Sequence, residues 1–197
     1  MDELLRSLKH FITRDVVYLV GGGTMMLAFS YGFSLDWKAE LPVALYLLLA
    51  GIAYVLGYAA QDIAGTIRLA RTIPPKKLFF PMTIIYRLFF GSKWKDITSP
   101  TDLHDIAFRL PDEQDRIRHE RIVTLKQVGT TMGPSCLISS CFLHIRATAT
   151  RSQIDTTLFW LSISLGFLFI VLAWLKAAEQ STFLDKFEII NGQVKRR

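Results

Sequence analysis

Three long runs of the sequence contain no Asp, Glu, Lys or Arg, and this feature constrains the fold more than any other. The runs cover residues 16–35, 41–61 and 156–175. A helix needs about 20 apolar residues to cross a hydrocarbon core roughly 30 Å thick, and each run has that length. Three such runs in a chain of 197 residues are not typical of the buried core helices of a soluble domain. We therefore predict three transmembrane helices.

The first run follows a basic N-terminal segment, as the apolar part of a signal peptide does. It is longer than that part usually is, and the residues around its end, FSLDWKAE, contain no clear small-x-small cleavage motif. We therefore interpret residues 16–35 as a permanent span, preceded by an amphipathic helix.

A fourth apolar segment, residues 127–145 (QVGTTMGPSCLISSCFLHI), is rich in Ser, Thr, Gly and Cys. On a helix with 3.6 residues per turn, several of its small residues share one face. They are Gly129, Gly133, Cys136 and Ser140. Glycines four residues apart in an apolar helix are typical of close helix packing. We predict a fourth span whose small-residue face either packs against Ala53 and Gly57 of the second span or lines the axis of a homo-oligomer.

Lys and Arg are distributed unevenly among the hydrophilic segments. With residues 127–145 counted as a span, 20 of the 23 fall on one side of the membrane, in the N-terminal segment, in residues 62–126 and in the C-terminal tail. The other three lie in the two short connections and are Lys38, Arg146 and Arg151. Because Lys and Arg concentrate in cytoplasmic loops, we predict a multi-pass protein of the bacterial inner (cell) membrane with both termini in the cytoplasm.

The net charge of +6 and the pI of about 9.4 have the same explanation. A basic cytoplasmic face is attracted to anionic lipid headgroups. The sequence contains no helix-turn-helix, zinc-finger or other nucleic-acid-binding pattern. The lipid bilayer is therefore an expected partner, and direct binding to nucleic acid is not expected.

These predictions divide an all-α polytopic chain into four regions. Residues 1–61 hold the N-terminal amphipathic helix and the first two transmembrane helices, and residues 62–121 form a helical cytoplasmic and interfacial segment. Residues 122–177 hold the third and fourth transmembrane helices, and residues 178–197 form a cytoplasmic tail. Within the second region, residues 76–95 have basic residues at both ends of a mostly apolar, aromatic stretch. This pattern predicts an interfacial helix, and a docking helix for a partner protein is the alternative.

Pro111 and the acidic residues after it predict the start of a helix, because proline and negative charge are both favoured in the first turn. We expect this helix to continue without a break into the span at 127–145, with same-face ion pairs such as Arg116–Glu120. Its basic residues are our candidates for contact with a cytoplasmic protein. They are Arg116, Arg118 and Arg121.

Two His–acid pairs, His104 with Asp105 and His119 with Glu120, are the only residues that suggest an enzymatic or metal site. Two histidines and a carboxylate are able to bind a divalent metal. Their spacing, however, matches no established metal or catalytic signature, and an ordinary solvated face also accounts for them. We therefore predict no catalytic residue, no metal ligand and no cofactor.

Three classes of function fit these features. A non-enzymatic membrane subunit would sense or anchor at the inner membrane and signal to a cytoplasmic protein through residues 62–126. An oligomeric pore or membrane-disrupting effector would use the small-residue face of residues 127–145. A membrane enzyme would act on a lipid-linked substrate near His104 and His119. We favour the first class, because helix-packing surfaces and a cytoplasmic extension are the organised features of the chain.

The stretches RDVVYLVGGG (residues 14–23) and RHERIVTLKQVG (residues 118–129), together with the size and four-span layout, resemble the small membrane component of the bacterial Kiwa anti-phage defence system, the KwaA family. The resemblance implies a membrane sensor that forms a homo-oligomer and works with a cytoplasmic DNA-binding partner. It implies no functional residue, because neither stretch is a motif of known chemistry. On this basis we expect a role in antiviral defence.

Overall fold

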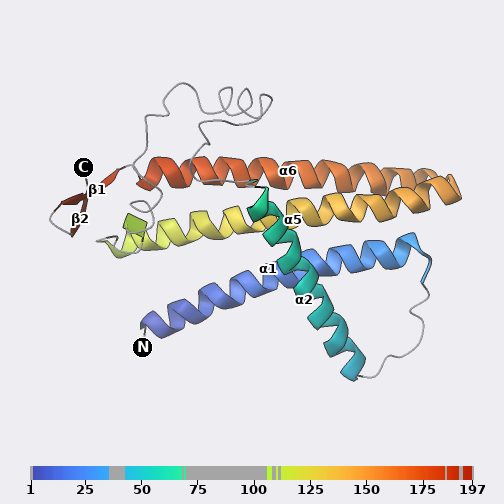
Figure 1. Ribbon diagram of the computed structural model, residues 1–197, viewed down its shortest axis with the longest axis horizontal. Coiled ribbons are helices and arrows are strands. Elements are labelled where there is room, and N and C mark those ends of the chain that lie inside the picture. The colour runs from blue at the N-terminus through green and yellow to red at the C-terminus, as the bar shows by residue number, and fades with distance from the viewer. Residues whose placement is uncertain are drawn as a thin grey trace. The chain divides into compact units, whose positions relative to one another are not determined.

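The computed structural model describes residues 2–35, 43–67, 69, 106–107, 110, 112–184, 186–190 and 193–196. Four long helices make up most of this part of the chain (Figure 1). They are α1 (Asp2–Gly32), α2 (Val43–Thr66), α5 (Glu113–Thr150) and α6 (Gln153–Leu184). A hairpin of two short strands follows, β1 (Phe187–Ile190) and β2 (Gln193–Arg196). The prediction of a mainly helical protein is confirmed.

The C-terminal hairpin departs from the predicted all-α class. β1 and β2 pair antiparallel with Ile190 opposite Gln193, so that only Asn191 and Gly192 separate the two strands. Asn-Gly between strand-forming residues is a strong signal for a two-residue hairpin. The apolar residues around this dipeptide therefore account for strands in a region where charge alone predicted a tail.

α5 is one unbroken helix of 38 residues, and the predicted continuation into residues 127–145 is confirmed. Its first turn contains Glu113 and Asp115, whose negative charge is favoured by the helix dipole. Pro134 lies inside the helix and is buried. A buried position suits it, because neighbouring helices support the backbone where proline removes one hydrogen bond.

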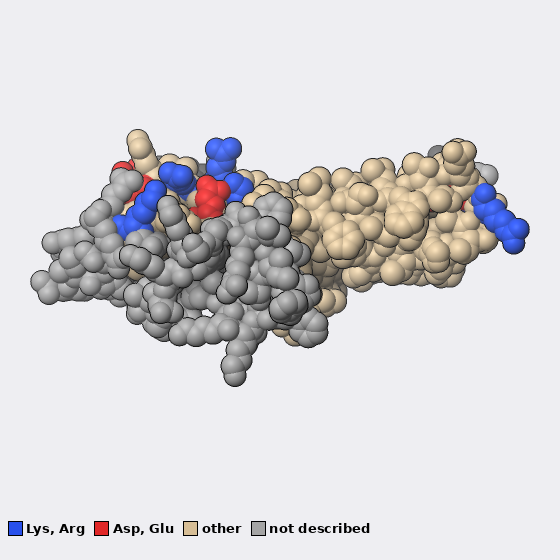
Figure 2. All heavy atoms as spheres, turned by 90° about the horizontal axis from the view of Figure 1, so that it is seen from above, with Lys and Arg blue, Asp and Glu red and all other residues tan. Residues whose placement is uncertain are grey.

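Two of the described helices, α2 and α6, are long and apolar enough to cross a membrane. Their apolar windows have mean hydropathies of 2.0 and 2.4, yet only 17% of each window is buried. Large apolar side chains such as Leu47 and Leu168 are exposed instead. Apolar surface left in water costs about 25 cal/mol per Å², and hydrocarbon around the helix removes that cost. On the face shown in Figure 2, a broad band carries no Lys, Arg, Asp or Glu.

The other predicted spans, residues 16–35 and 127–145, fall on α1 and α5. Both helices are long enough to cross a membrane, at 31 and 38 residues, but they are less apolar than α2 and α6 and are not among the two candidate spans. The predicted interfacial helix at residues 76–95 lies outside the described residues.

Contacts within the chain define two units, which are described separately. Unit 1 comprises residues 1–70 and 124–173, and unit 2 comprises residues 71–123 and 174–197. α1 and α2 belong to unit 1, the hairpin belongs to unit 2, and α5 and α6 contribute residues to both.

In unit 1, α1 and α2 cross at glycines. A Cβ atom added to Gly22 would lie 1.6 Å from the carbonyl oxygen of Ala53, and one added to Gly57 would lie 1.9 Å from the carbonyl oxygen of Tyr18. Both distances are far shorter than a van der Waals contact. Only glycine therefore permits the two backbones to approach this closely.

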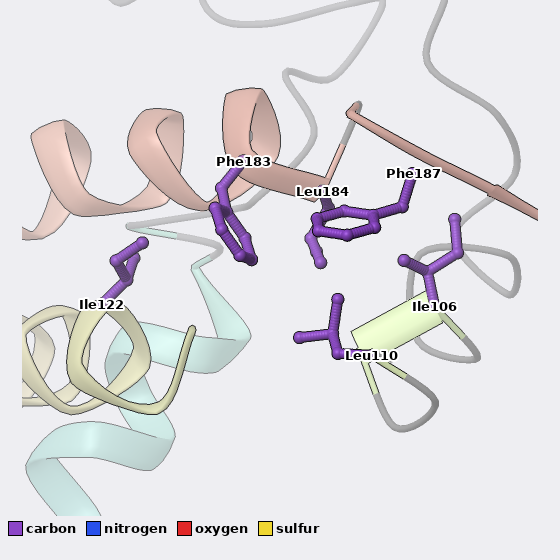
Figure 3. Close-up of a cluster of buried hydrophobic side chains, with 6 residues drawn as sticks. All are labelled: Ile106, Leu110, Ile122, Phe183, Leu184 and Phe187. Atoms are coloured by element: carbon purple, nitrogen blue, oxygen red, sulfur yellow. The ribbon is translucent and has the colours of Figure 1, made fainter. Parts of the chain in front are cut away.

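Unit 2 contains a cluster of buried hydrophobic side chains (Figure 3). Its members are Ile106, Leu110, Ile122, Phe183, Leu184 and Phe187. The ring centroids of Phe183 and Phe187 are 5.4 Å apart, a distance typical of favourable aromatic pairs. The cluster brings together α5, α6, β1 and the segment before α5, and so gives unit 2 a core of its own.

Candidate functional site

The small polar residues of α5 lie in the interior of unit 1. Thr131, Ser135 and Ser139 each have at most 1% of their surface exposed. The hydroxyls of Thr131 and Ser135 are hydrogen-bonded, to Gln61 and to the carbonyl oxygen of Thr131 respectively, which stabilises them in an apolar bundle. The composition that distinguishes residues 127–145 thus belongs to a packing surface within one chain.

Gly129 and Gly133 face α6. A Cβ atom added to Gly129 would lie 2.5 Å from the carbonyl oxygen of Phe169, and one added to Gly133 would lie 2.8 Å from Cγ1 of Ile170. Gly166 of α6 lies opposite, because a Cβ atom there would be 3.2 Å from the carbonyl oxygen of Gly133. The absence of side chains at these positions lets α5 and α6 approach closely.

Cys136 and Ser140 continue this face of α5. Cys136 is buried, and its carbonyl oxygen accepts a hydrogen bond of 2.8 Å from Oγ of Ser162 on α6. Ser140 is also buried, and its Oγ donates to the carbonyl oxygen of Leu137 at 2.7 Å. Cys136 and Cys141 are both free thiols.

A second face of α5 contacts α1 and α2. A Cβ atom added to Gly21 of α1 would lie 2.9 Å from both Oγ of Ser135 and Cγ2 of Thr131. Oγ1 of Thr131 donates a hydrogen bond of 3.1 Å to Oε1 of Gln61 on α2. Oγ of Ser135 donates to the carbonyl oxygen of Thr131 at 2.8 Å. This face of α5 therefore contacts α1 and α2 through hydroxyl-bearing side chains, whereas the other face contacts α6 through glycines.

One of the two predictions for the small-residue face of α5 was that it packs against Ala53 and Gly57. The structure does not place Ala53 and Gly57 against Gly129 and Gly133. They contact α1, where Gly22 and the backbone of Tyr18 are their neighbours. The physical reason is Gly22 of α1, whose missing side chain leaves room for the α2 backbone to approach there.

A buried ionic cluster joins the end of α1 to the connection between α5 and α6. Asp155 has 3% of its surface exposed, and its carboxylate accepts hydrogen bonds from the hydroxyl of Tyr31, at 2.6 Å, and from that of Thr150. Nε of Arg146 lies 3.8 Å from the same carboxylate, and the Arg146 guanidinium also donates to Ser34. These contacts pair a buried carboxylate with a cation and fix the end of α1. No sequence motif had singled out this cluster.

Residues in the left-handed backbone conformation follow α1 and α5, two of the three helices that contribute to this cluster. Ser34 has a φ of 55°, and the amide of Leu35 donates to the carbonyl oxygen of Ser30 at 2.9 Å, which makes a Schellman motif at the end of α1. Arg151 has a φ of 54°, and its amide donates to the carbonyl oxygen of Ala147 at 3.0 Å at the end of α5. This conformation costs a non-glycine residue about 1–2 kcal/mol.

The basic residues predicted to face a partner lie near the start of α5, in unit 2. Arg116, Arg118 and Arg121 are all exposed. Nε of Arg116 donates to the carbonyl oxygen of Leu110 at 2.7 Å, and the Arg118 guanidinium lies 5.5 Å from the centre of the Phe183 ring. Arg116 thus binds the backbone, and the expected ion pair with Glu120 does not form among the described residues.

His119 lies at the edge of the hydrophobic cluster of unit 2. Its Nε2 is 3.1 Å from Nε2 of Gln180, and its ring stacks on Phe183 with centroids 6.3 Å apart. His104 and Asp105, the other half of the considered metal site, lie outside the described residues. Within the described part of the chain, no group of three or more His, Cys, Asp or Glu side chains is placed to hold a metal ion.

Comparisons of the chain with protein-family models, curated proteins and solved structures found no match. The fold and the site define the chain as a helical protein with two helices that are able to cross a membrane.

Proposed function

We propose that the chain is a non-enzymatic subunit of the bacterial inner membrane that senses or anchors there and signals to a cytoplasmic protein. In this proposal α1, α2, α5 and α6 all cross the membrane, residues 76–95 form an interfacial helix, and both termini are cytoplasmic. The observation that carries the proposal is the dual use of α5 and α6. They pack together through glycines in unit 1, and they also supply Ile122, Phe183 and Leu184 to the core of unit 2.

This dual use supports signalling because a helix is stiff along its axis. A displacement of α5 or α6 within the bundle would move residues that belong to the core of unit 2. Each helix therefore offers a physical route from a change in the bilayer to a change in the cytoplasm. The exposed Arg118 and Arg121 would meet the partner.

Charge supports the proposed orientation. The connection between α5 and α6 is placed outside the cytoplasm, where Lys and Arg are disfavoured. Arg146, near the end of α5, forms an ion pair with the buried Asp155 of α6, so that its positive charge is offset at that end. Exposed apolar surface on α2 and α6 offers contact area for a homo-oligomer.

Burial favours this proposal over an oligomeric pore. A pore would need the hydroxyl-rich face of α5 to line water. Thr131, Ser135 and Ser139 are instead enclosed by their own chain, with at most 1% of each residue exposed. Helix packing accounts for this composition without a channel.

Affinity purification of the full chain from detergent-solubilised membranes tests the proposal. We expect a cytoplasmic protein to be recovered in a fixed ratio, and the double variant Arg118→Glu/Arg121→Glu to lose it. Lys186→Glu, an exposed change elsewhere in unit 2, is the matched control and should retain the partner. A chain that is recovered from the membrane without any partner contradicts the proposal.

A role in anti-phage defence, which the resemblance to the KwaA family implies, has its own test. The gene and each neighbouring gene are deleted separately, and phage plating efficiency is measured. We expect plating to rise when this gene or the partner's gene is removed. Unchanged plating across a broad phage panel rules out the defence role while leaving the signalling proposal to the purification experiment.

A further inference from the structure

Unit 1 contains an apolar pocket of about 440 Å³ between α1, α2 and α5. Small-molecule sites commonly have volumes of about 300–1,000 Å³, so the pocket is large enough for a ligand. Its wall contains only apolar side chains: Met25, Met26, Phe29, Leu35, Leu49, Ile52, Leu56, Ile138 and Phe142.

The pocket opens to the surroundings of the bundle. Phe29, Leu35 and Ile52 belong to its wall and are exposed. An open pocket without polar wall groups has nothing that would hold water in place. In the proposed membrane orientation, the acyl chains of lipids contact this opening.

A cationic group lies just beyond one end of the pocket. Arg146 is one helical turn after Phe142 on α5, and it donates a hydrogen bond to Ser34, the neighbour of the wall residue Leu35. α1 and α5 come close beside it, since a Cβ atom on Gly32 would lie 2.7 Å from the carbonyl oxygen of Phe142. The apolar pocket and the guanidinium therefore occupy successive turns of the same two helices.

The guanidinium has capacity to bind an anion in addition to its present contacts. It carries five N–H donors, and its contacts in the structure are a hydrogen bond to Ser34, an ion pair with Asp155 and a cation–π contact with the Tyr31 ring, 5.1 Å from its centre. The Asp155 carboxylate offsets one positive charge, but Arg151 follows in the same connection and is exposed. A guanidinium matches the geometry of a phosphate.

We propose that this pocket and Arg146 together bind one phospholipid of the outer leaflet, with an acyl chain between α1, α2 and α5 and the anionic headgroup at Arg146. The proposal rests on the membrane orientation proposed above and deepens it, because the chain would then read lipid composition directly. A phospholipid fits both parts of the site. A second copy of the chain would fill only the apolar part of the site, whereas a phospholipid also supplies a phosphate for Arg146.

Native mass spectrometry of the full chain in detergent tests this proposal. The probes are phosphatidylglycerol and phosphatidylcholine with the same palmitoyl and oleoyl chains. We expect the wild type to retain one phosphatidylglycerol per chain and to retain phosphatidylcholine less well. Ile52→Trp, which fills the pocket, should lower the retention of phosphatidylglycerol about tenfold. Val55→Trp, on the same helix but outside the pocket wall, should leave retention unchanged.

The headgroup contact needs a variant that still folds. Arg146→Gln combined with Asp155→Asn removes both charges together, so that no buried carboxylate is left without its cation. We expect this double variant to retain the two lipids equally. A preference for phosphatidylglycerol that persists in it overturns the headgroup assignment.

Three results overturn the pocket assignment. The first is equal retention by the wild type and Ile52→Trp, and the second is an equal loss in Val55→Trp. The third is a smaller oligomer in Ile52→Trp alone, which would identify a second copy of the chain as the occupant. If the chain fractionates with membranes but retains no lipid, only this inference fails. Recovery of the chain in the soluble fraction removes the proposed function as well.

Discussion

α5 and α6 are consecutive helices of similar length, 38 and 32 residues, and they differ in the composition of the surfaces that they expose and bury. α6 exposes large apolar side chains such as Trp160 and Phe167, whereas α5 buries small polar ones such as Thr131 and Ser135. In water this arrangement would be unstable. In hydrocarbon, large apolar residues suit the outer surface, and close backbone approach and internal hydrogen bonds hold the interior together. The contrast is the main structural argument for a membrane location.

The largest effect is expected from a bulky residue on the buried face of α5. Gly129→Leu places a side chain where even a Cβ atom would be 2.5 Å from the carbonyl oxygen of Phe169, which is a backbone atom and is unable to move aside cheaply. We expect a destabilisation of about 3 kcal/mol or more. Loss of the folded species, measured by circular dichroism during detergent unfolding, checks it.

Gly51→Leu is the control for Gly129→Leu, because a Cβ atom on Gly51 has nothing within 4 Å. It should unfold at the same point as the wild type. Equal behaviour of the two leucine variants would show that α5 and α6 are not closely packed.

A hydroxyl on the same helix should have an intermediate effect. Thr131→Val keeps the shape of a fully buried side chain but removes its hydrogen bond to Gln61. We expect a loss of about 1 kcal/mol in the free energy of unfolding. Thr157→Val, on the exposed start of α6, should cost much less.

A double-mutant cycle of Thr131→Val with Gln61→Leu separates this bond from other effects of the substitutions. A coupling energy near zero would show that the two side chains do not interact in the folded protein.

The smallest expected effect is a gain in stability at the connection between the two helices. Arg151 adopts a φ of 54°, a region that glycine enters without a steric penalty. Arg151→Gly should therefore raise the free energy of unfolding by up to about 1 kcal/mol. Arg14→Gly, inside α1, should lower it instead, and a loss of stability in Arg151→Gly would contradict the assigned backbone conformation.

The sequence predicted the helical fold and the length of α5 because these depend on patterns within one segment. Charge-free runs mark α2 and α6, and Pro111 with its acidic neighbours marks the start of α5. The sequence did not show which helix each glycine contacts. The spacing of Gly129 and Gly133 indicates a packing face, but it contains no information on which helix contacts that face.

The ionic cluster around Asp155 was harder to predict, since its members come from three separate segments. Tyr31 and Arg146 are 115 positions apart, and neither belongs to a known motif. One local signal was present. Ser152 and Asp155 have the spacing of a helix cap and the third residue after it, which indicates a helix start but not the contacts with Arg146 and Tyr31.

We propose that the chain crosses the membrane with both termini inside, and single-cysteine labelling tests this topology most directly. In a background of Cys136→Ala and Cys141→Ala, one new cysteine replaces the exposed Ala149, near the α5–α6 connection, or the exposed Glu113, at the start of α5. With a membrane-impermeant maleimide on intact cells, we expect labelling of Ala149→Cys at once and of Glu113→Cys only after permeabilisation. Equal labelling of the two positions in intact cells would contradict it.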